Sequence, residues 1–427
     1  MTYVIVGGGV STLGAIEGIR QRDKQGRIVV ISAEREPIYG RPLISYFLAG
    51  KIGPSDLPLR PREYYEKNMV ELKLGAKVTA IDPKRKVVTM STGESTAFDK
   101  LLLATGGVPF SPPITGLDGP GIYSFTTAEH ARTLDKLASS LKRAVVIGGG
   151  LIGLKAAESL FDRGVDVSIV ELAPRVLSAA FDDEAGALVQ DRLHKVGLHI
   201  HCNVSAKEIK RSEAGALKGV LLSDGRFLEA EAVVVAIGVV PEKSLAVSAG
   251  LKVDRGILVD DRLETSAKGI YAAGDVVQAL DMIAGDARVV PIWPNAYKQG
   301  FAAGLNMAGA GRSFEGGLAM NSISFYGLAT ASVGLVNPQG DGYEVHRLLN
   351  EQKQTYRKLV FKDDRLVGYV LVGDIDRAGL YTGFIRFKLP LAPEIKEKLM
   401  AGQPCALLWP EEIFKNHWNP ESDAAAG

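Results

Sequence analysis

Two glycine turns, each followed by a distant carboxylate, are the features of this chain best suited to binding chemistry. Glycines occupy positions 7–9 directly after one apolar run and positions 148–150 directly after another. In each case the next apolar run ends in an acid, Glu34 or Glu171. Glycine lets backbone N–H groups approach a pyrophosphate, and a carboxylate accepts hydrogen bonds from ribose hydroxyls. The spacing therefore predicts two dinucleotide sites.

The elements that must position these residues are predicted to be two copies of a strand, a turn, a helix and a second strand. Residues 4–15 align with residues 145–156, and half of the aligned positions are identical. A single glycine turn would be weak support, because such turns also join strands to helices for structural reasons alone. Two copies favour a repeated βαβ unit whose helix N-termini face phosphates. Thr12 replaces the third glycine of the first copy, where we expect a small β-branched residue to fit.

The composition is that of an ordinary globular chain with two or three domains. The chain has 427 residues, 46% of them hydrophobic, and its 50 Lys and Arg nearly balance its 49 Asp and Glu. This balance argues against a nucleic-acid binder and against a protein bound to anionic membranes by its charge. No apolar run approaches the roughly 20 residues of a membrane helix. Because it has two cysteines and a strand predicted to begin at residue 2, we expect a cytoplasmic protein without a disulfide framework.

Four further segments, two between the glycine turns and two after the second, stand in an order that matches a known family. They are the Arg-Pro-x-x-Ser segment within residues 39–45, the Ala-Thr-Gly turn within 102–109, the glycine-containing segment 235–241 and the Gly-Asp end of 265–275. With the two turns, these segments resemble the FAD-dependent pyridine-nucleotide oxidoreductases, a family of flavoproteins with two dinucleotide-binding domains. Within it, the chain is similar to the branch of rubredoxin reductases, ferredoxin reductases and the flavin module of nitrite reductases.

This resemblance implies an α/β fold with two Rossmann-like domains and a small C-terminal α+β domain. An FAD domain at residues 1–112 and 243–315 would be interrupted by an NAD domain at 113–242, with an interface domain at 316–427. The residues implied for FAD are Gly7, Gly9, Glu34, Arg41, Pro42, Ala104, Thr105, Gly106, Gly274 and Asp275. The residues implied for NAD(H) are Gly148, Gly150, Gly153, Glu171 and Gly238. Glu171 favours NAD over NADP, because a carboxylate repels a 2′-phosphate, although Arg175 lies close by in sequence.

Three residues near the implied flavin and nicotinamide have competing interpretations. Trp293 is similar to the tryptophan that the branch places near the isoalloxazine, and is also explained as a core residue. Tyr46 stands where many members of the branch have a lysine. Lys155 replaces the family's glutamate near the nicotinamide, so it either tunes the flavin as a nearby cation or is a solvated helix lysine.

Cysteine positions limit how electrons leave the flavin. Disulfide reductases of this superfamily carry a cysteine pair in the segment equivalent to residues 39–50, which contains no cysteine here. Cys202 and Cys405 are isolated, so no iron–sulfur cluster is indicated. His199 and His201 share one face of a predicted strand, but no further ligand cluster accompanies them and no metal site is predicted.

The residues and the resemblance together predict an FAD-containing enzyme that moves electrons between NADH and an iron–sulfur carrier or partner subunit, in either direction. The lack of an internal second redox centre suits the flavin subunit of a larger redox system. The alternatives are a stand-alone NADH oxidase or quinone reductase, and a nucleotide-sensing protein with a vestigial flavin. No nucleic-acid partner is expected. The C-terminal domain is a candidate oligomer contact, and Trp409 and Trp418 form a candidate partner surface.

Overall fold

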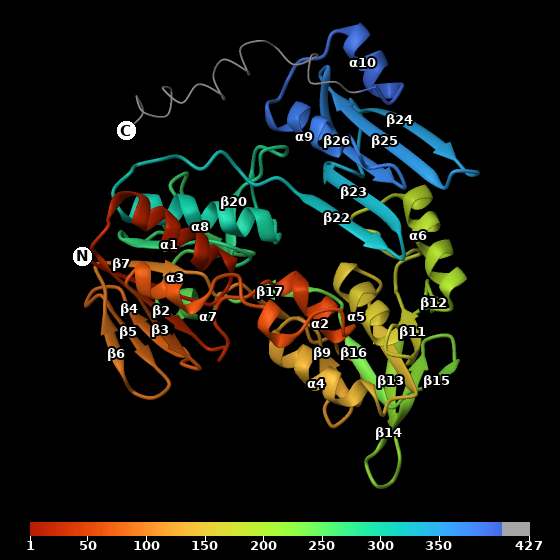
Figure 1. The fold of residues 1–427 in the computed structure, drawn as a ribbon, viewed down its shortest axis with the longest axis horizontal. Coiled ribbons are helices and arrows are strands. Elements are labelled where there is room, and N and C mark those ends of the chain that lie inside the picture. The colour runs from red at the N-terminus through yellow and green to blue at the C-terminus, as the bar shows by residue number, and fades with distance from the viewer. Residues whose placement is uncertain (404–427) are drawn as a thin grey trace. The chain divides into compact units, whose positions relative to one another are not determined.

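The computed structural model describes residues 1–403 as two compact units. One unit contains Met1–Leu177 and His194–Gly317, and the other contains Ser178–Leu193 together with the chain from Leu318. Figure 1 shows the elements of both units. Cys405, Trp409 and Trp418, for which the sequence carried predictions, lie outside the described residues. Within residues 1–403, no helix is both long and apolar enough to cross a membrane.

The first parallel sheet lies in the first unit and carries the first glycine turn. Its five strands run in the order β19-β7-β1-β2-β3, and every neighbouring pair is parallel. The strands are β1 (Thr2–Val6), β2 (Arg27–Ser32), β3 (Val70–Leu74), β7 (Lys100–Leu103) and β19 (Ile270–Ala272). Helix α1 (Val10–Arg22) joins β1 to β2, and these apolar strands are buried as a parallel sheet requires.

The second parallel sheet repeats this arrangement around the second glycine turn. It runs in the order β12-β11-β10-β16-β9 and is again parallel throughout. The strands are β9 (Ile122–Ser124), β10 (Arg143–Ile147), β11 (Asp166–Val170), β12 (His199–His201) and β16 (Ala232–Val235). Helix α5 (Leu151–Phe161) takes the place of α1. The repeat seen in the sequence is therefore a repeat of structure.

Smaller elements of the first unit accompany the two parallel sheets. Each parallel sheet has a three-stranded antiparallel companion, formed by β4 (Val78–Asp82), β5 (Val87–Met90) and β6 (Ser95–Ala97), and by β13 (Ala206–Arg211), β14 (Leu217–Leu222) and β15 (Phe227–Glu229). A two-stranded antiparallel ribbon pairs β8 (Gly107–Pro109) with β17 (Val239–Pro241). The other elements are α2 (Ile44–Leu48), α3 (Arg62–Lys67), α4 (Ala128–Ala138), α7 (Ser244–Ser248), β18 (Ile257–Leu258), β20 (Val277–Leu280), β21 (Ala287–Arg288), and 3-10 turns at Arg41–Leu43 and Pro54–Asp56.

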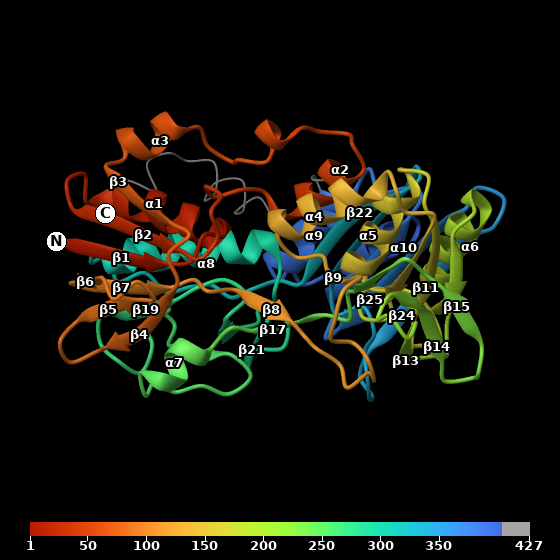
Figure 2. The same cartoon turned by 90° about the horizontal axis from the view of Figure 1, so that it is seen from below.

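Helices α1 and α8 (Trp293–Met307) pack backbone against backbone, as Figures 1 and 2 show. Gly14 and Gly18 of α1 lie against the backbone of α8, and Gly300 and Gly304 of α8 lie against the backbone of α1. A Cβ added to Gly300 would lie 1.9 Å from the Ser11 carbonyl oxygen. A Cβ on Gly14 would likewise lie 2.3 Å from a carbonyl oxygen of α8. The spacing of four residues in both helices explains part of the glycine content of the chain, because these positions share one helix face.

The second unit contains a five-stranded antiparallel sheet in the order β22-β23-β26-β25-β24. Its strands are β22 (Met320–Phe325), β23 (Leu328–Gly334), β24 (Glu344–Asn350), β25 (Thr355–Lys362) and β26 (Arg365–Val372). The helices are α9 (Ala378–Arg386), α10 (Pro393–Met400) and most of α6 (Asp183–Val196). Strands β25 and β26 form a hairpin that closes between Lys362 and Arg365. The three-domain boundaries predicted from the sequence stay a prediction.

Candidate nucleotide-binding sites

The first glycine turn is shaped by one position that excludes a side chain and one that leaves room. Gly7 has a φ of 132°, and a Cβ there would lie 2.0 Å from the Ala104 carbonyl oxygen. At Gly9 an added Cβ would meet no atom of residues 1–403 within 4 Å. Gly9 precedes α1, whose first turn holds no acid and whose N-terminus receives no side-chain cap from the described chain. The N–H groups there are therefore free to bind an anion such as a pyrophosphate.

Thr12 closes the first turn locally. Its hydroxyl donates a hydrogen bond to the Gly7 carbonyl oxygen at 2.8 Å, and the residue is buried. The equivalent Gly153 solves the same close approach differently, since a Cβ there would lie 1.9 Å from the Gly148 carbonyl oxygen. The small β-branched residue fits as expected. Its hydroxyl forms a hydrogen bond with the carbonyl oxygen of the turn, whereas glycine approaches the corresponding oxygen by having no side chain.

Two residues implied for FAD meet after the first turn. Arg41 Nη2 donates to Glu34 Oε1 at 2.5 Å, and Tyr39 Oη donates to Glu34 Oε2 at 2.6 Å. Arg41 Nη1 also donates to the Thr126 carbonyl oxygen at 2.8 Å. Glu34, which follows β2, is thus oriented by Arg41 of the Arg-Pro segment and by Tyr39. Tyr39, adjacent to that segment, was not singled out from the sequence.

The Ala-Thr-Gly and Gly-Asp segments come to the same end of the first sheet. A Cβ on Gly274 would lie 3.1 Å from Ser11 Oγ, and the Gly274 N–H donates to Gln299 Oε1 at 2.9 Å. Burial raises the pKa of Asp275, and the positive charge of Arg41 partly offsets that shift. Thr105 Oγ1 donates to the Glu242 carbonyl oxygen at 2.7 Å. Gln299 and Ser11 are contacts that the sequence pattern did not indicate.

Trp293 is not a core residue. It is 40% exposed at the start of α8, and its ring stacks on Tyr297 with centroids 6.4 Å apart and planes 9° apart. The Tyr297 hydroxyl in turn donates to Glu17 of α1. The stack fixes an exposed aromatic surface at this end of α8.

The second glycine turn repeats the shape of the first, but its acid is bonded by the backbone and not by side chains. A Cβ on Gly148 would lie 2.4 Å from the Ala236 carbonyl oxygen, whereas one on Gly150 would contact nothing within 4 Å in the described part of the chain. The first turn of α5 also contains no acid. Glu171 accepts hydrogen bonds from the backbone N–H groups of Gly149 at 2.5 Å and Ala173 at 2.7 Å. Its carboxylate is therefore anchored by main-chain donors beside the turn.

Gly238 ends the second sheet as Gly106 ends the first. Gly238 has a φ of 113° and Gly106 a φ of 69°, conformations that favour glycine. A Cβ on either would find open space within 4 Å among residues 1–403. The two cradles are therefore alike in shape, and both fit a nucleotide.

Lys155 is neither a lone cation nor a solvated lysine. Its Nζ lies 2.6 Å from Glu158 Oε2, and the two side chains are only 19% and 10% exposed. Ser159, the next residue of α5, donates from Oγ to the Ser45 carbonyl oxygen at 2.9 Å. This bond ties α5 to α2, which presents Tyr46 to solvent. Glu158 offsets the charge of Lys155, and the predicted tuning role stays a prediction.

The two histidines of β12 have protein partners. His199 Nε2 lies 3.4 Å from Asp166 Oδ1, and His201 Nδ1 lies 3.0 Å from Arg226 Nη1. Burial lowers the pKa of His201, and the charge of Arg226 lowers it further. Cys202 is a half-buried thiol whose pKa is raised by burial. Among residues 1–403 no group of three metal-ligating side chains comes together.

Comparison with known proteins agrees with this geometry. Residues 1–300 match the pyridine nucleotide-disulphide oxidoreductase family, and residues 320–388 match the rubredoxin NAD+ reductase C-terminal domain. The chain belongs to the pyridine nucleotide-disulphide oxidoreductase family. Its members bind FAD and NAD(H), and the two uncapped helix N-termini fit such ligands. The predicted α/β fold, the class of NAD(H)-dependent flavin oxidoreductase and the cofactors FAD and NAD(H) are thereby confirmed.

Individual relatives and solved structures extend the match. The chain is 32% identical to the NADH-dependent phenylglyoxylate dehydrogenase subunit epsilon of Aromatoleum evansii, over 97% of this chain and 98% of that one. It is 33% identical to the nitrite reductase [NAD(P)H] of Bacillus subtilis over 87% of this chain, but spans only 45% of that protein. The structure of the ferredoxin reductase for the CYP199A2 system of Rhodopseudomonas palustris has a TM-score of 0.86 at 27% identity, and covers 95% of this chain and 100% of that one.

Proposed function

We propose that this protein moves electrons between NADH and a one-electron iron–sulfur acceptor, as the flavin subunit of a larger redox system. One observation carries the proposal. Two glycine turns, each opening onto an uncapped helix N-terminus, stand at the ends of two parallel sheets in one unit, while residues 39–50 carry no cysteine. Two nucleotides can bind, but the electrons have no disulfide of that type through which to leave.

The first turn is the proposed FAD site. The N–H groups at the start of α1 would bind the pyrophosphate, because Gly7 and Gly9 keep that space free of side chains. The Glu34 carboxylate, which Arg41 orients, would accept hydrogen bonds from ribose hydroxyls. Asp275, beside the first turn of α1, would face the rest of the flavin. When bound, FAD supplies the conversion between a two-electron donor and one-electron steps. The proposed site also contains Pro42, Ala104, Thr105, Gly106, Gly274 and Trp293.

The second turn is the proposed NAD(H) site. Gly148, Gly150 and Gly153 allow the start of α5 to approach a pyrophosphate. The carboxylate of Glu171 is fixed by two backbone N–H groups and would bind the adenosine ribose. Gly238 leaves the end of β16 open for the ligand. No acid or base is required of the chain for hydride transfer itself, so its residues bind and orient.

The acceptor is proposed from chemistry and from likeness. One similar protein is named as the ferredoxin reductase for the CYP199A2 system, and another is named as a subunit of an NADH-dependent phenylglyoxylate dehydrogenase. Electron flow in either direction is compatible with the site, because orientation of the two nucleotides serves both. We also propose a cytoplasmic location, which cell fractionation with an antibody to the chain would test.

Anaerobic reduction and reoxidation test the function. The purified holoprotein is reduced with NADH without oxygen, and its reoxidation by a ferredoxin is compared with its reoxidation by air. Fast transfer to the iron–sulfur protein and slow reaction with oxygen support the proposal. Faster reoxidation by air or by a quinone would instead make the protein a stand-alone oxidase or quinone reductase. If NADH left the flavin oxidised, the nucleotide-sensing alternative would replace both.

A further inference from the structure

Two residues after the end of helix α5, Arg163 holds two other helices of the first unit. Its Nη1 donates to the carbonyl oxygen of Leu48, the last residue of α2, at 3.0 Å. The same nitrogen donates to Asp135 Oδ1 of α4 at 2.6 Å. The side chains of Arg163 and Asp135 are 27% and 34% exposed, so their ion pair is partly shielded from water. One guanidinium group therefore joins the ends of α2 and α5 to α4 through charge-assisted hydrogen bonds.

Further polar contacts join α5 to the region of α2. Ser159 Oγ lies 2.9 Å from the Ser45 carbonyl oxygen of α2 and 2.5 Å from the Lys155 carbonyl oxygen, so its single proton is shared between them. Ser159 is buried. Lys51 Nζ, just beyond α2, lies 2.7 Å from Asp162 Oδ2. Because that lysine is half exposed, its ion pair contributes little, and the more buried contacts determine how α5 lies on α2.

Helices α2 and α4 are both anchored at the segment proposed to bind FAD. Helix α2 begins two residues after Pro42, and Ser45 Oγ donates to the Pro42 carbonyl oxygen at 3.0 Å. Helix α4 begins beside Tyr39, which also bonds the acid of the first turn. The Tyr39 hydroxyl accepts the Ala128 N–H at the start of α4 at 2.9 Å. The two helices that Arg163 holds are therefore parts of the surroundings of the first site.

Helix α5 has the proposed NAD(H) site at its other end. It begins directly after Gly150, and its 11 residues span about 16 Å at 1.5 Å per residue. Leu154, Ala157 and Leu160 are buried, and α5 packs on β10 and β11 of the second sheet. Packed interiors resist local deformation. A shift at the end of α5 that carries Arg163 would therefore move the second turn and its sheet together.

We propose that Arg163 and Ser159 are positioning residues for hydride transfer, because they fix the second turn relative to the first site. In this step a hydride, one proton with two electrons, leaves NADH as NAD+ and reduces FAD by two electrons. A displacement of about 1 Å between reacting groups can slow a reaction about 100-fold. Affinity is less sensitive, because each turn binds its nucleotide with its own residues. The inference rests on the proposed assignment of FAD and NAD(H) to the two turns.

Replacement of Arg163 tests the inference through a split between rate and affinity. In Arg163→Met holoprotein, the rate of flavin reduction at saturating NADH, measured anaerobically by stopped flow, is expected to fall about tenfold. The dissociation constant for NAD+, measured by calorimetry on the oxidised protein, should stay within about twofold of the unchanged value. Flavin content and the rate of reduction by dithionite should not change. A residue that only stabilised the fold would lower the melting temperature and leave the rate at saturating NADH unchanged.

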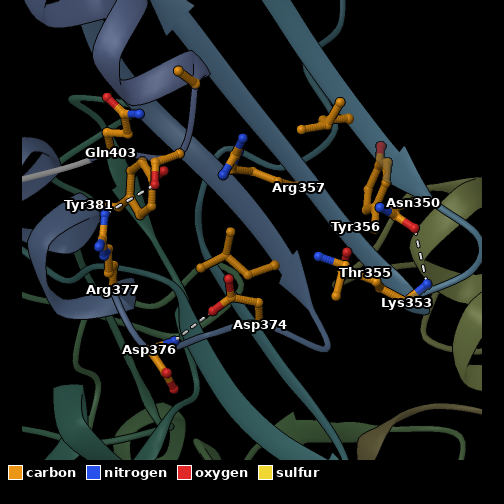
Figure 3. Close-up of a pocket in the computed structure, with 14 residues that line it drawn as sticks. Asn350, Lys353, Thr355, Tyr356, Arg357, Asp374, Asp376, Arg377, Tyr381 and Gln403 are labelled. Atoms are coloured by element: carbon orange, nitrogen blue, oxygen red, sulfur yellow. Dashed lines mark hydrogen bonds between the residues drawn. The ribbon is translucent and has the colours of Figure 1, made fainter.

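Arg357 provides a matched control in the second unit. Its Nη2 donates to the carbonyl oxygen of Met400, the last residue of α10, at 2.9 Å, which is the same kind of bond to a helix end. Figure 3 shows Arg357 in a cavity of about 600 Å³, directed toward Tyr381. Arg357→Met breaks a bond within the second unit, so it should leave the rate of flavin reduction within about twofold of the unchanged protein.

Two gentler variants cover the case in which Arg163→Met does not fold. Ser159→Ala removes one shared hydrogen bond and should slow flavin reduction about threefold, whereas Arg163→Lys keeps a charged donor and should lose less of the rate than Arg163→Met. An unchanged rate in every folded variant would overturn the inference. A loss of NAD+ affinity as large as the loss of rate, or equal slowing in Arg357→Met, would also overturn it. Failure of NADH to reduce the flavin of the unchanged protein would instead overturn the proposed function.

Discussion

At the scale of single residues, the two acids that define the nucleotide turns are held in different ways. Glu34 is bonded by the side chains of Arg41 and Tyr39, so a positive charge stands beside it. Glu171 is bonded by the backbone N–H groups of Gly149 and Ala173, which orient its carboxylate. If the second turn binds NAD(H) as proposed, the Glu171 carboxylate would repel the 2′-phosphate of NADP.

Removing that charge should change the choice of nucleotide. In Glu171→Gln, one oxygen acceptor is replaced by an amide donor that faces a backbone N–H, so we expect NADH binding to weaken by about 1–2 kcal/mol. The KM for NADH should rise about tenfold, and the preference for NADH over NADPH should shrink because repulsion is lost. Steady-state reduction of ferricyanide with each nucleotide measures both. Glu213→Gln, at an exposed position, should alter neither value. If Glu171→Gln kept an unchanged preference for NADH over NADPH, the interpretation would be contradicted.

His130 should make stability depend on pH near neutrality. Burial lowers the pKa of His130, and its Nδ1 accepts the Thr126 N–H at 3.3 Å, an interaction that requires an unprotonated nitrogen. The unfolded chain therefore binds this proton more readily, around the ordinary pKa of about 6.5, and folding stability falls as pH is lowered through that range.

Thermal unfolding of the holoprotein between pH 7.5 and pH 5.5 measures this effect. Between pH 7.5 and pH 5.5, the melting temperature of the His130→Gln variant should fall by less than that of the unchanged protein. His194→Gln, on an exposed position of α6, should behave like the unchanged protein. Equal slopes in all three proteins would show that His130 titrates alike in both states.

At the scale of elements, the contact of α1 with α8 links the first glycine turn to a helix nearly 300 residues later. Ser11 lies in the first turn of α1, and its carbonyl oxygen is the atom that a side chain at Gly300 would strike. The same helix α8 carries Gln299, which accepts the Gly274 N–H. Helix packing and the shape of the proposed FAD site are therefore set by one close contact.

Gly300→Ala should destabilise the protein and loosen FAD together. The added Cβ would sit 1.9 Å from the Ser11 carbonyl oxygen, so the helices must separate, at a cost of about 1–3 kcal/mol. The melting temperature and the ratio of flavin to protein absorbance should both fall. Gly379 in α9 offers a matched control, because a Cβ there would meet no atom of the described chain within 4 Å, and Gly379→Ala should be neutral or slightly stabilising. Full FAD content in Gly300→Ala would separate the helix contact from the site.

At the scale of the whole molecule, the two parallel sheets are copies for which we propose different ligands, so their sites should be separable by mutation. Gly9 and Gly150 occupy matching positions, both with extended backbone and open space where a side chain would begin. A carboxylate introduced there would cap the helix and repel a pyrophosphate without straining the chain.

Gly150→Asp should abolish NADH binding and leave FAD in place. We expect reduction of the flavin by NADH to slow at least 100-fold, while dithionite still reduces it fully. The partner variant Gly9→Asp should be purified without FAD. Loss of FAD from Gly150→Asp, or unchanged reduction by NADH, would show that the second turn is not the NAD(H) site.

Sequence reasoning reached the features that are local in the chain. Both turns and the acids at 34 and 171 follow from residues within about 30 positions of one another, where glycine and apolar spacing constrain the backbone. Asp182, by contrast, is held by contacts that are remote in the chain. Its bonds to Lys358 and Tyr356 join residues more than 170 positions apart, and no local pattern encodes such a pairing. The ion pair of Lys155 with Glu158 was near enough to find, since residues three apart share a helix face.

The position of β19 in the first sheet has a consequence for how the protein is made. This strand pairs with β7 and supplies a buried edge of the sheet, yet about 165 residues are synthesised between the two strands. At roughly 5–20 residues per second, the ribosome takes on the order of 10–30 s to span that gap. All strands of the second sheet emerge during this interval. The second parallel sheet can therefore be completed before the first. Until β19 is synthesised, the first sheet has the edge of β7 uncovered, and an unpaired strand edge of this kind is prone to aggregation.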